Sequence, residues 1–138
     1  MIEISPKVER RVAIVNENRS VLEAAQVMVD RFIGSVVVEG SSVIQGIFTE
    51  RDLMRVVAQR QDPATVKLKE VMRTALVHVA PDDSVEHCMD LMRKNQCRHL
   101  LVFDRGDFVG IVSLRDLAAL MLEEKEALVE QLTSYITS

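Results

Sequence analysis

Two copies of one short motif hold the residue types that suit a phosphate-bearing ligand. Residues 46–52 read GIFTERD, and residues 110–116 read GIVSLRD. In each copy, a strand-like apolar run ends at a hydroxyl residue, where a helix is expected to begin. The N–H groups at a helix N-terminus attract phosphate, the arginine can pair with phosphate oxygens, and the carboxylate can accept hydrogen bonds from ribose hydroxyls. The motif therefore predicts a nucleotide contact.

The same spacing also fits a capping box, in which a hydroxyl residue and an acidic residue three positions later start a helix. Thr49 with Asp52 satisfies this pattern, and so does Ser113 with Asp116. Finding the motif twice can reflect common ancestry alone. The spacing therefore leaves two interpretations open, a ligand site and a simple helix cap.

A gapless internal repeat contains both motifs. Shifting the sequence by 64 residues places Ser20 on Ser84, Met28 on Met92 and Arg51 on Arg115. Apolar periodicity predicts the element order β-α-β-β-α in each copy. The predicted strands are 12–15, 35–38 and 43–48 in the first copy and 76–79, 99–103 and 108–112 in the second, with helices beginning after Ser20, Thr49, Ser84 and Ser113.

The crossover helix of each copy implies a parallel strand pair, and the short turn implies an antiparallel hairpin. We therefore expect an α/β fold of the α+β type. Tandem βαββα repeats would pack sheet to sheet as one pseudo-two-fold module, followed by a C-terminal helix. The expected boundaries are 8–60 for the first repeat, 61–71 for a linker, 72–122 for the second repeat and 123–138 for the extension. A short helical turn is expected at 69–72.

Composition limits the classes of partner. The 138 residues are 48% hydrophobic and carry a net charge of −4, which argues against a nucleic-acid footprint. No apolar run approaches the roughly 18 residues of a membrane span, and the N-terminus lacks an apolar signal region. We therefore expect a cytoplasmic protein that binds neither nucleic acid nor membrane. Aromatic residues make up only 4%, so a ligand pocket would have aliphatic walls.

Metal and catalytic sites are not expected. The candidate ligands all fall in the second repeat, but no pair has the spacing typical of a zinc site. Cys88 is on the predicted buried face of its helix, and two cysteines nine positions apart do not indicate a disulfide framework. The residues considered are His78, His87, His99, Cys88 and Cys97.

The segment after Leu122 continues the helical pattern and would present an apolar stripe. Leu128, Leu132, Tyr135 and Ile136 follow at helical spacing. Two alternatives fit equally well: a tail that folds back on its own domain, and a contact between two copies of the chain.

The βαββα unit, its duplication and the two Gly-x-x-[Thr/Ser]-x-x-Asp elements resemble the CBS-domain family, named after cystathionine β-synthase. The CRHLLV segment at 97–102 also looks like a family hallmark. The resemblance spans about residues 8–122 and is strongest to short stand-alone CBS-pair proteins. It implies a regulatory module with no catalytic residue and no catalytic cofactor. A ligand-free dimerisation or scaffold module is the alternative.

Such pairs bind adenosine-containing ligands in clefts between their repeats and modulate a partner or their own assembly, commonly as homodimers. The ligand would be AMP, ADP, ATP, NAD(H) or S-adenosylmethionine, with AMP and NAD(H) favoured. The resemblance assigns ribose hydroxyls to Asp52 and Asp116, phosphate or ribose to Thr49 and Ser113, and phosphate to Arg51, Arg98 and Arg115. The base would lie against a wall formed by Val12, Ile14, Ser35, Val36, Val77, Val79, His99 and Leu100.

The two copies differ at one point of this site. Gly34-Ser35 in the first copy corresponds to Arg98-His99 in the second, which is charged where the first is small. The two sites therefore need not bind equally well.

Overall fold

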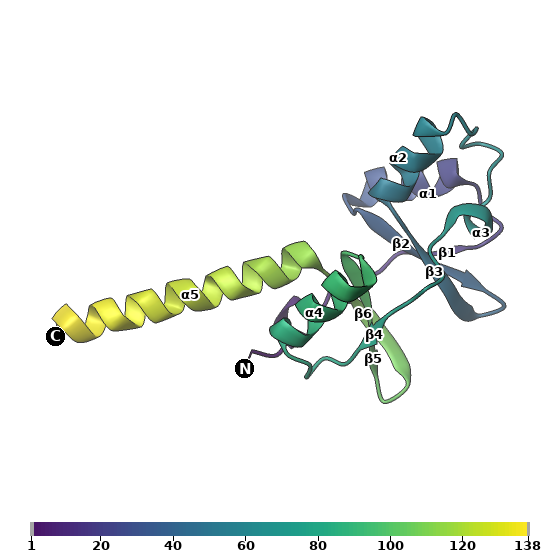
Figure 1. Ribbon diagram of the computed structural model, residues 1–138. Coiled ribbons are helices and arrows are strands. Elements are labelled where there is room, and N and C mark those ends of the chain that lie inside the picture. The colour runs from purple at the N-terminus through teal and green to yellow at the C-terminus, as the bar shows by residue number, and fades with distance from the viewer. Residues whose placement is uncertain (1, 138) are drawn as a thin grey trace. The chain divides into compact units, whose positions relative to one another are not determined.

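The computed structural model describes residues 2–137 and contains two three-stranded sheets, one from each copy of the repeat (Figure 1). The first copy forms β1 (Ile14–Asn16), α1 (Val21–Arg31), β2 (Ser35–Gly40), β3 (Val43–Thr49) and α2 (Glu50–Ala58). The second forms β4 (His78–Val79), α4 (Val85–Asn95), β5 (His99–Asp104), β6 (Asp107–Ser113) and α5 (Leu114–Thr137). The predicted element order and the mixed α/β class are confirmed.

Both sheets have the predicted pairing. β1 lies parallel to β2, and β2 lies antiparallel to β3; β4, β5 and β6 repeat this arrangement. Each hairpin closes through two residues with positive φ, Ser41 and Ser42 at 52° and 62°, and Arg105 and Gly106 at 53° and 86°. Two such residues define the tight turn whose twist matches that of the flanking strands. The turn therefore fixes the register of β3 and β6, which lead into the two motifs.

Helices α1 and α4 begin at serine caps. The Ser20 hydroxyl accepts a hydrogen bond from the Glu23 N–H at 3.1 Å, and Ser84 accepts from the His87 N–H at 3.1 Å. This bond satisfies one of the free N–H groups of a first helical turn. One apolar face of each helix is buried: Val21, Ala24 and Met28 in α1, and Val85, Cys88 and Met92 in α4.

The two compact units do not follow chain order. One unit is Met1–Arg10 together with Val77–Ser138, and the other is Arg11–Leu76. Each unit has its own cluster of buried hydrophobic side chains. The repeat boundaries given above therefore describe the duplicated sequence and stay a prediction, while the packing divides the chain at other points.

This division arises because each leading segment packs with the other copy. The short helix η1 (Ser5–Lys7) is preceded by Ile4, which is fully buried in the core of the second copy. The short helix α3 (Leu68–Val71), close to the predicted helical turn, begins with Leu68, which is fully buried in the core of the first copy.

Backbone hydrogen bonds hold both leading segments in place. Glu9 exchanges two bonds with Ile111 of β6, at 2.8 and 3.1 Å. Arg73 exchanges two bonds with Ile47 of β3, at 2.9 and 3.0 Å. The two arrangements are equivalent, because the 64-residue shift relates Glu9 to Arg73 and Ile47 to Ile111.

Helix α5 continues well beyond the second repeat, as predicted for the extension (Figure 1). It is 24 residues long, and its side chains from 121 to 136 are all exposed. Of the two alternatives for this segment, the tail folded back on its own domain does not fit, because such a tail would bury its apolar face. None of the helices in the described part of the chain is long and apolar enough to span a membrane.

Candidate functional site

The first motif forms a complete capping box at the junction of β3 and α2. The Thr49 N–H and hydroxyl both donate to Oδ2 of Asp52, at 2.9 and 3.1 Å. In return, the Asp52 N–H donates to the Thr49 hydroxyl oxygen at 3.3 Å. Asp52 is only 9% exposed. The cap interpretation is therefore confirmed for this copy.

The second motif repeats this geometry at the junction of β6 and α5. The Ser113 N–H and hydroxyl donate to Oδ2 of Asp116 at 2.9 and 2.8 Å, and the Asp116 N–H donates back at 3.1 Å. The cap uses one oxygen of each aspartate. It leaves the ligand interpretation open, because the second carboxylate oxygen can still accept hydrogen bonds.

The two copies differ at the aspartate oxygen that the cap does not use, Oδ1. Oδ1 of Asp52 accepts a hydrogen bond from Nη1 of Arg55 at 3.1 Å, in an ion pair whose arginine side chain is 57% exposed. In the second copy, the position equivalent to Arg55 is occupied by Ala119. Within the described residues, Oδ1 of Asp116 has no hydrogen bond or ion pair.

The two motifs do not predict the role of Arg55, because this residue lies outside the positions that the two copies share. A signal was available, since an Asp and an Arg three positions apart lie on the same face of a helix. The pair occupies the Asp52 oxygen that a ribose would use. The arginine of this pair is exposed, however, and ion pairs open to solvent contribute only about 0–1 kcal/mol.

The start of the middle strand lies beside each motif. Ser35 pairs with Thr49, and His99 pairs with Ser113. The Leu114 N–H also donates to the carbonyl oxygen of Arg98 at 2.9 Å. The structure therefore brings Arg98 and His99 next to the second motif. Arg51 and Arg115 belong to the motifs themselves and are exposed on the first turns of α2 and α5.

The residues expected to form the wall against the base differ in their burial. Val36, Val79 and Leu100 are buried within the hydrophobic clusters, so their side chains are part of the cores. Ser35 is also buried, Val12 and Val77 are partly buried, and Ile14 is exposed. A base could reach the core residues only through their backbone atoms, and the wall stays a prediction.

Within the described residues, no three His, Cys, Asp or Glu side chains form a group that could hold a metal ion. His78 instead packs against Phe103 with ring centroids 4.4 Å apart. Cys88 is fully buried, and Cys97 is partly exposed. Burial, and to a smaller degree the Asp83 carboxylate, raise the pKa of the Cys88 thiol to about 11. This thiol is therefore protonated at neutral pH.

We predict that a thiol-reactive disulfide reagent modifies Cys97 and leaves Cys88 intact in the folded chain. A thiol with its pKa raised to about 11 holds very little thiolate at neutral pH, and burial also blocks access of the reagent. Mass spectrometry of peptides from chain modified at neutral pH measures both sites. In urea, both thiols should react. Equal reaction rates in the folded chain would contradict the buried position of Cys88.

The CBS-domain family model matches residues 3–59 and 68–123, so this chain belongs to the CBS-domain family. The match covers both copies of the repeat, which makes the chain a CBS-pair regulatory module. Among its relatives, the CBS domain-containing protein YhcV of Bacillus subtilis is 35% identical over 128 residues, which cover 92% of this chain and 91% of that protein. The resemblance inferred from the motifs is thus confirmed.

Solved structures agree with this fold. A Burkholderia ambifaria protein, described as a signal-transduction protein with CBS domains, superposes with a TM-score of 0.78 at 34% identity, covering 83% of this chain and 85% of that chain. Hypoxic Response Protein I, solved with two coordinated zinc ions, gives a TM-score of 0.69 at 27% identity, covering 86% of this chain and 98% of that chain.

Proposed function

We propose that this chain is a regulatory module that binds an adenosine-containing ligand, with AMP or NAD(H) favoured, and that Asp116 holds the ribose. One observation carries the proposal: Ser113 fixes Oδ2 of Asp116, while Oδ1 has no partner among the described residues. A carboxylate that is oriented in advance can accept hydrogen bonds from a ribose with little loss of side-chain freedom.

The cations near the second motif suit the phosphate of such a ligand. Arg98 is joined to the start of α5 by the Leu114 N–H, and Arg115 is exposed one position before Asp116. The N–H groups of Leu114 and Asp116 already have partners. The phosphate would therefore depend on arginine side chains more than on the helix N-terminus.

The first copy is proposed as the weaker site. Arg55 already neutralises Asp52, and small residues stand where the second copy has Arg98 and His99. A ribose would have to displace Arg55 before it could reach Oδ1 of Asp52. One ligand per chain is therefore expected at moderate concentrations. A cytoplasmic location and the absence of enzymatic turnover belong to the same proposal.

A ligand-free scaffold is the second candidate. The observation that favours it is that both capping boxes are complete without any ligand. In that case both motifs would serve only to start α2 and α5. The two candidates differ in what a ligand does to the stability of the chain.

The deciding experiment is thermal unfolding, followed by circular dichroism, with AMP, ADP, ATP, NADH and S-adenosylmethionine in separate samples. A ligand at 100 times its dissociation constant should stabilise the folded chain by about 2.7 kcal/mol. We expect AMP or NADH to raise the melting temperature, and chromatography of the recovered nucleotide to show no conversion. If all five ligands leave the melting temperature unchanged at millimolar concentration, the scaffold interpretation replaces the sensor.

A further inference from the structure

The N-terminal leading segment carries a lysine towards the second motif. Glu9 forms an antiparallel bridge with Ile111 of β6 and exchanges two backbone hydrogen bonds with it. Because the two segments run in opposite directions, the chain from Glu9 back to Lys7 runs beside the end of β6, towards Ser113. Lys7 therefore lies near the point where β6 ends and α5 begins.

The Lys7 side chain reaches the face of α5 that carries Asp116. Its ammonium donates a hydrogen bond to Oε1 of Glu123 at 2.7 Å. Glu123 follows Asp116 by seven residues, close to two turns at about 3.6 residues per turn, so the two carboxylates project on the same side of the helix. The Glu123 side chain is 56% exposed, and ion pairs open to solvent contribute only about 0–1 kcal/mol. Lys7 can therefore exchange this partner for another anion at little cost.

The first copy supports this placement of Lys7. The 64-residue shift relates Lys7 to Val71 and Asp116 to Asp52. In the first copy, Val71 and Asp52 line one pocket of about 230 Å³. Because the two leading segments are held in equivalent ways, a lysine at the position of Val71 borders the equivalent space beside Asp116.

The two motifs also differ in the charge beside the middle strand. In the first copy, the Glu50 carboxylate lies against Gly34, since a Cβ on this glycine would be 2.7 Å from its Oε1. The second copy has Leu114 and Arg98 at these two positions. An arginine therefore stands beside the second motif where the first motif has a carboxylate.

The pocket beside the first motif adds another carboxylate. Glu70 lines this pocket, whereas the equivalent residue of the second copy is Pro6. Carboxylates thus outnumber cations at the first motif, and cations outnumber carboxylates at the second, so that only the second attracts an anion. The residues compared are Glu50, Asp52, Glu70, Arg51 and Arg55 in the first copy and Asp116, Glu123, Lys7, Arg98 and Arg115 in the second.

Building on the proposed nucleotide site at Asp116, we infer that Lys7 is a further ligand-binding residue and makes this site select adenosine ligands that carry phosphate. The ammonium leaves Glu123 and pairs with a phosphate oxygen while Asp116 holds the ribose. AMP, ADP, ATP and NAD(H) all offer such an oxygen. Adenosine has no phosphate, and the sulfonium of S-adenosylmethionine is itself positive, so both should bind weakly.

Isothermal titration calorimetry of the full chain with AMP and with adenosine tests this role. Lys7→Gln should weaken AMP binding about 10-fold and leave adenosine binding unchanged, because a charge-assisted hydrogen bond to phosphate is lost. Lys7→Arg should keep the preference for AMP. Glu123→Gln should strengthen AMP binding, since it removes the anion that competes for Lys7. Circular dichroism checks that each variant is folded.

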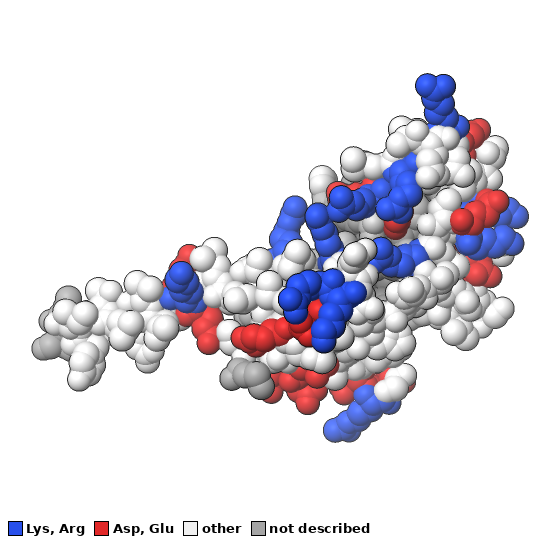
Figure 2. Space-filling model, in the orientation of Figure 1, with Lys and Arg blue, Asp and Glu red and all other residues white. Residues whose placement is uncertain are grey.

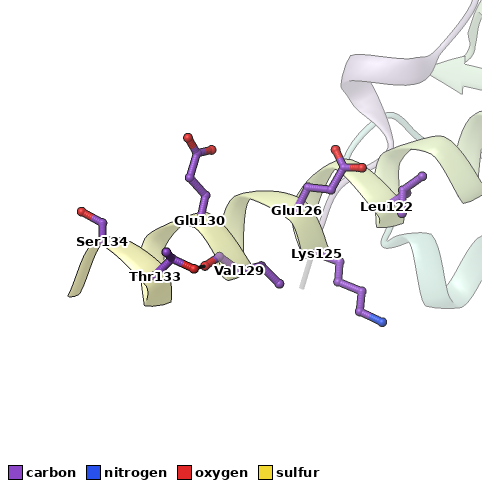
Figure 3. A pocket seen from close by; sticks show the side chains of 7 residues that line it. All are labelled: Leu122, Lys125, Glu126, Val129, Glu130, Thr133 and Ser134. Carbon is purple, nitrogen blue, oxygen red and sulfur yellow. Dashed lines mark hydrogen bonds between the residues drawn. The ribbon is translucent and has the colours of Figure 1, made fainter. Parts of the chain in front are cut away.

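Lys125→Gln is the matched control. In Figure 2, basic and acidic side chains stand together in the middle of α5, and most of the visible surface beyond them is uncharged. Lys125 is the only cation from 116 to 138 and follows Asp116 by nine residues, which places the two on opposite sides of the helix. Figure 3 shows Lys125 pointing away from Glu126 and Glu130. Its removal takes away one positive charge far from the ribose and should leave the affinity for AMP unchanged.

The ratio of the two affinities separates the possible results. If Lys7→Gln leaves AMP binding unchanged, or weakens AMP and adenosine equally, Lys7 does not contact the phosphate and the inference is overturned while the proposed function stands. An unmodified chain that binds neither AMP nor adenosine overturns the proposed function, and the inference with it. A loss of AMP affinity in Lys125→Gln as large as in Lys7→Gln would reduce the effect to overall charge and would also overturn the inference.

Discussion

Replacing Gly110 with alanine is expected to destabilise the unit that contains the second repeat by about 3 kcal/mol, the upper end of the usual range for overpacking. A Cβ at this position would overlap the carbonyl oxygen of Glu9 and lie 2.9 Å from Cγ1 of Val8. The Glu9 backbone cannot easily retreat, because its N–H and its carbonyl oxygen both form hydrogen bonds with Ile111, the next residue along β6. Alanine would therefore force the leading segment away from the sheet and expose Ile4.

Urea unfolding followed by circular dichroism measures this loss. Gly34→Ala is the matched control, because its Cβ would meet only the flexible end of the Glu50 side chain, 2.7 Å from Oε1. Gly46→Ala should resemble Gly110→Ala, since its Cβ would lie 2.7 Å from the carbonyl oxygen of Arg73. If Gly110→Ala and Gly34→Ala unfold at the same urea concentration, the leading segment is not held as the structure indicates.

The element order could be predicted because it depends on local patterns. In α1 and α4, apolar residues recur with helical period behind a serine cap, and each hairpin has two turn residues between apolar strands. Such signals involve neighbours in sequence, so a single chain is enough to read them. The predicted starts of β2 and β5, at Ser35 and His99, agree with the structure for this reason.

The exchange of leading segments could not be read from local patterns. The helix η1 is only three residues long and makes no side-chain cap. Apart from Ile2 and Val8, the hydrophobic residues clustered with Ile4 lie more than 70 positions away in the sequence. A partial signal exists: the 64-residue shift places Ile4 on Leu68 and Val8 on Met72, both apolar pairs. The shift shows that these positions are equivalent, but it does not show which sheet each one packs on.

The candidate site was partly predictable for a similar reason. The motif located Thr49, Asp52, Ser113 and Asp116, and the structure adds that each aspartate uses one oxygen for the cap. The state of the other oxygen depends on a residue outside the motif, Arg55 in one copy and Ala119 in the other.

This difference predicts the result of two matched substitutions. Asp116→Ala should weaken AMP binding at least about 30-fold, because the ribose loses its charged acceptor. Asp52→Ala should change the affinity of the occupied site little, because Asp52 is already neutralised by Arg55. Each variant loses one capping box, which costs about 1 kcal/mol. The two variants should therefore lose similar stability, so that isothermal titration calorimetry of AMP compares their binding affinities alone.

Substitutions at Arg55 and Ala119 test whether a free Oδ1 on the aspartate is what holds the ribose. One frees this oxygen in the first copy, and the other occupies it in the second copy. Arg55→Ala frees Oδ1 of Asp52, so the number of AMP molecules bound per chain should rise above one. Ala119→Arg places an arginine three positions after Asp116, where its guanidinium can pair with Oδ1 as Arg55 does with Asp52. Binding at the second motif should then weaken, with the capping box and the fold intact. If Ala119→Arg binds AMP as tightly as the unmodified chain, the free oxygen of Asp116 is not where the ribose is held, because an arginine at that position would compete for it directly.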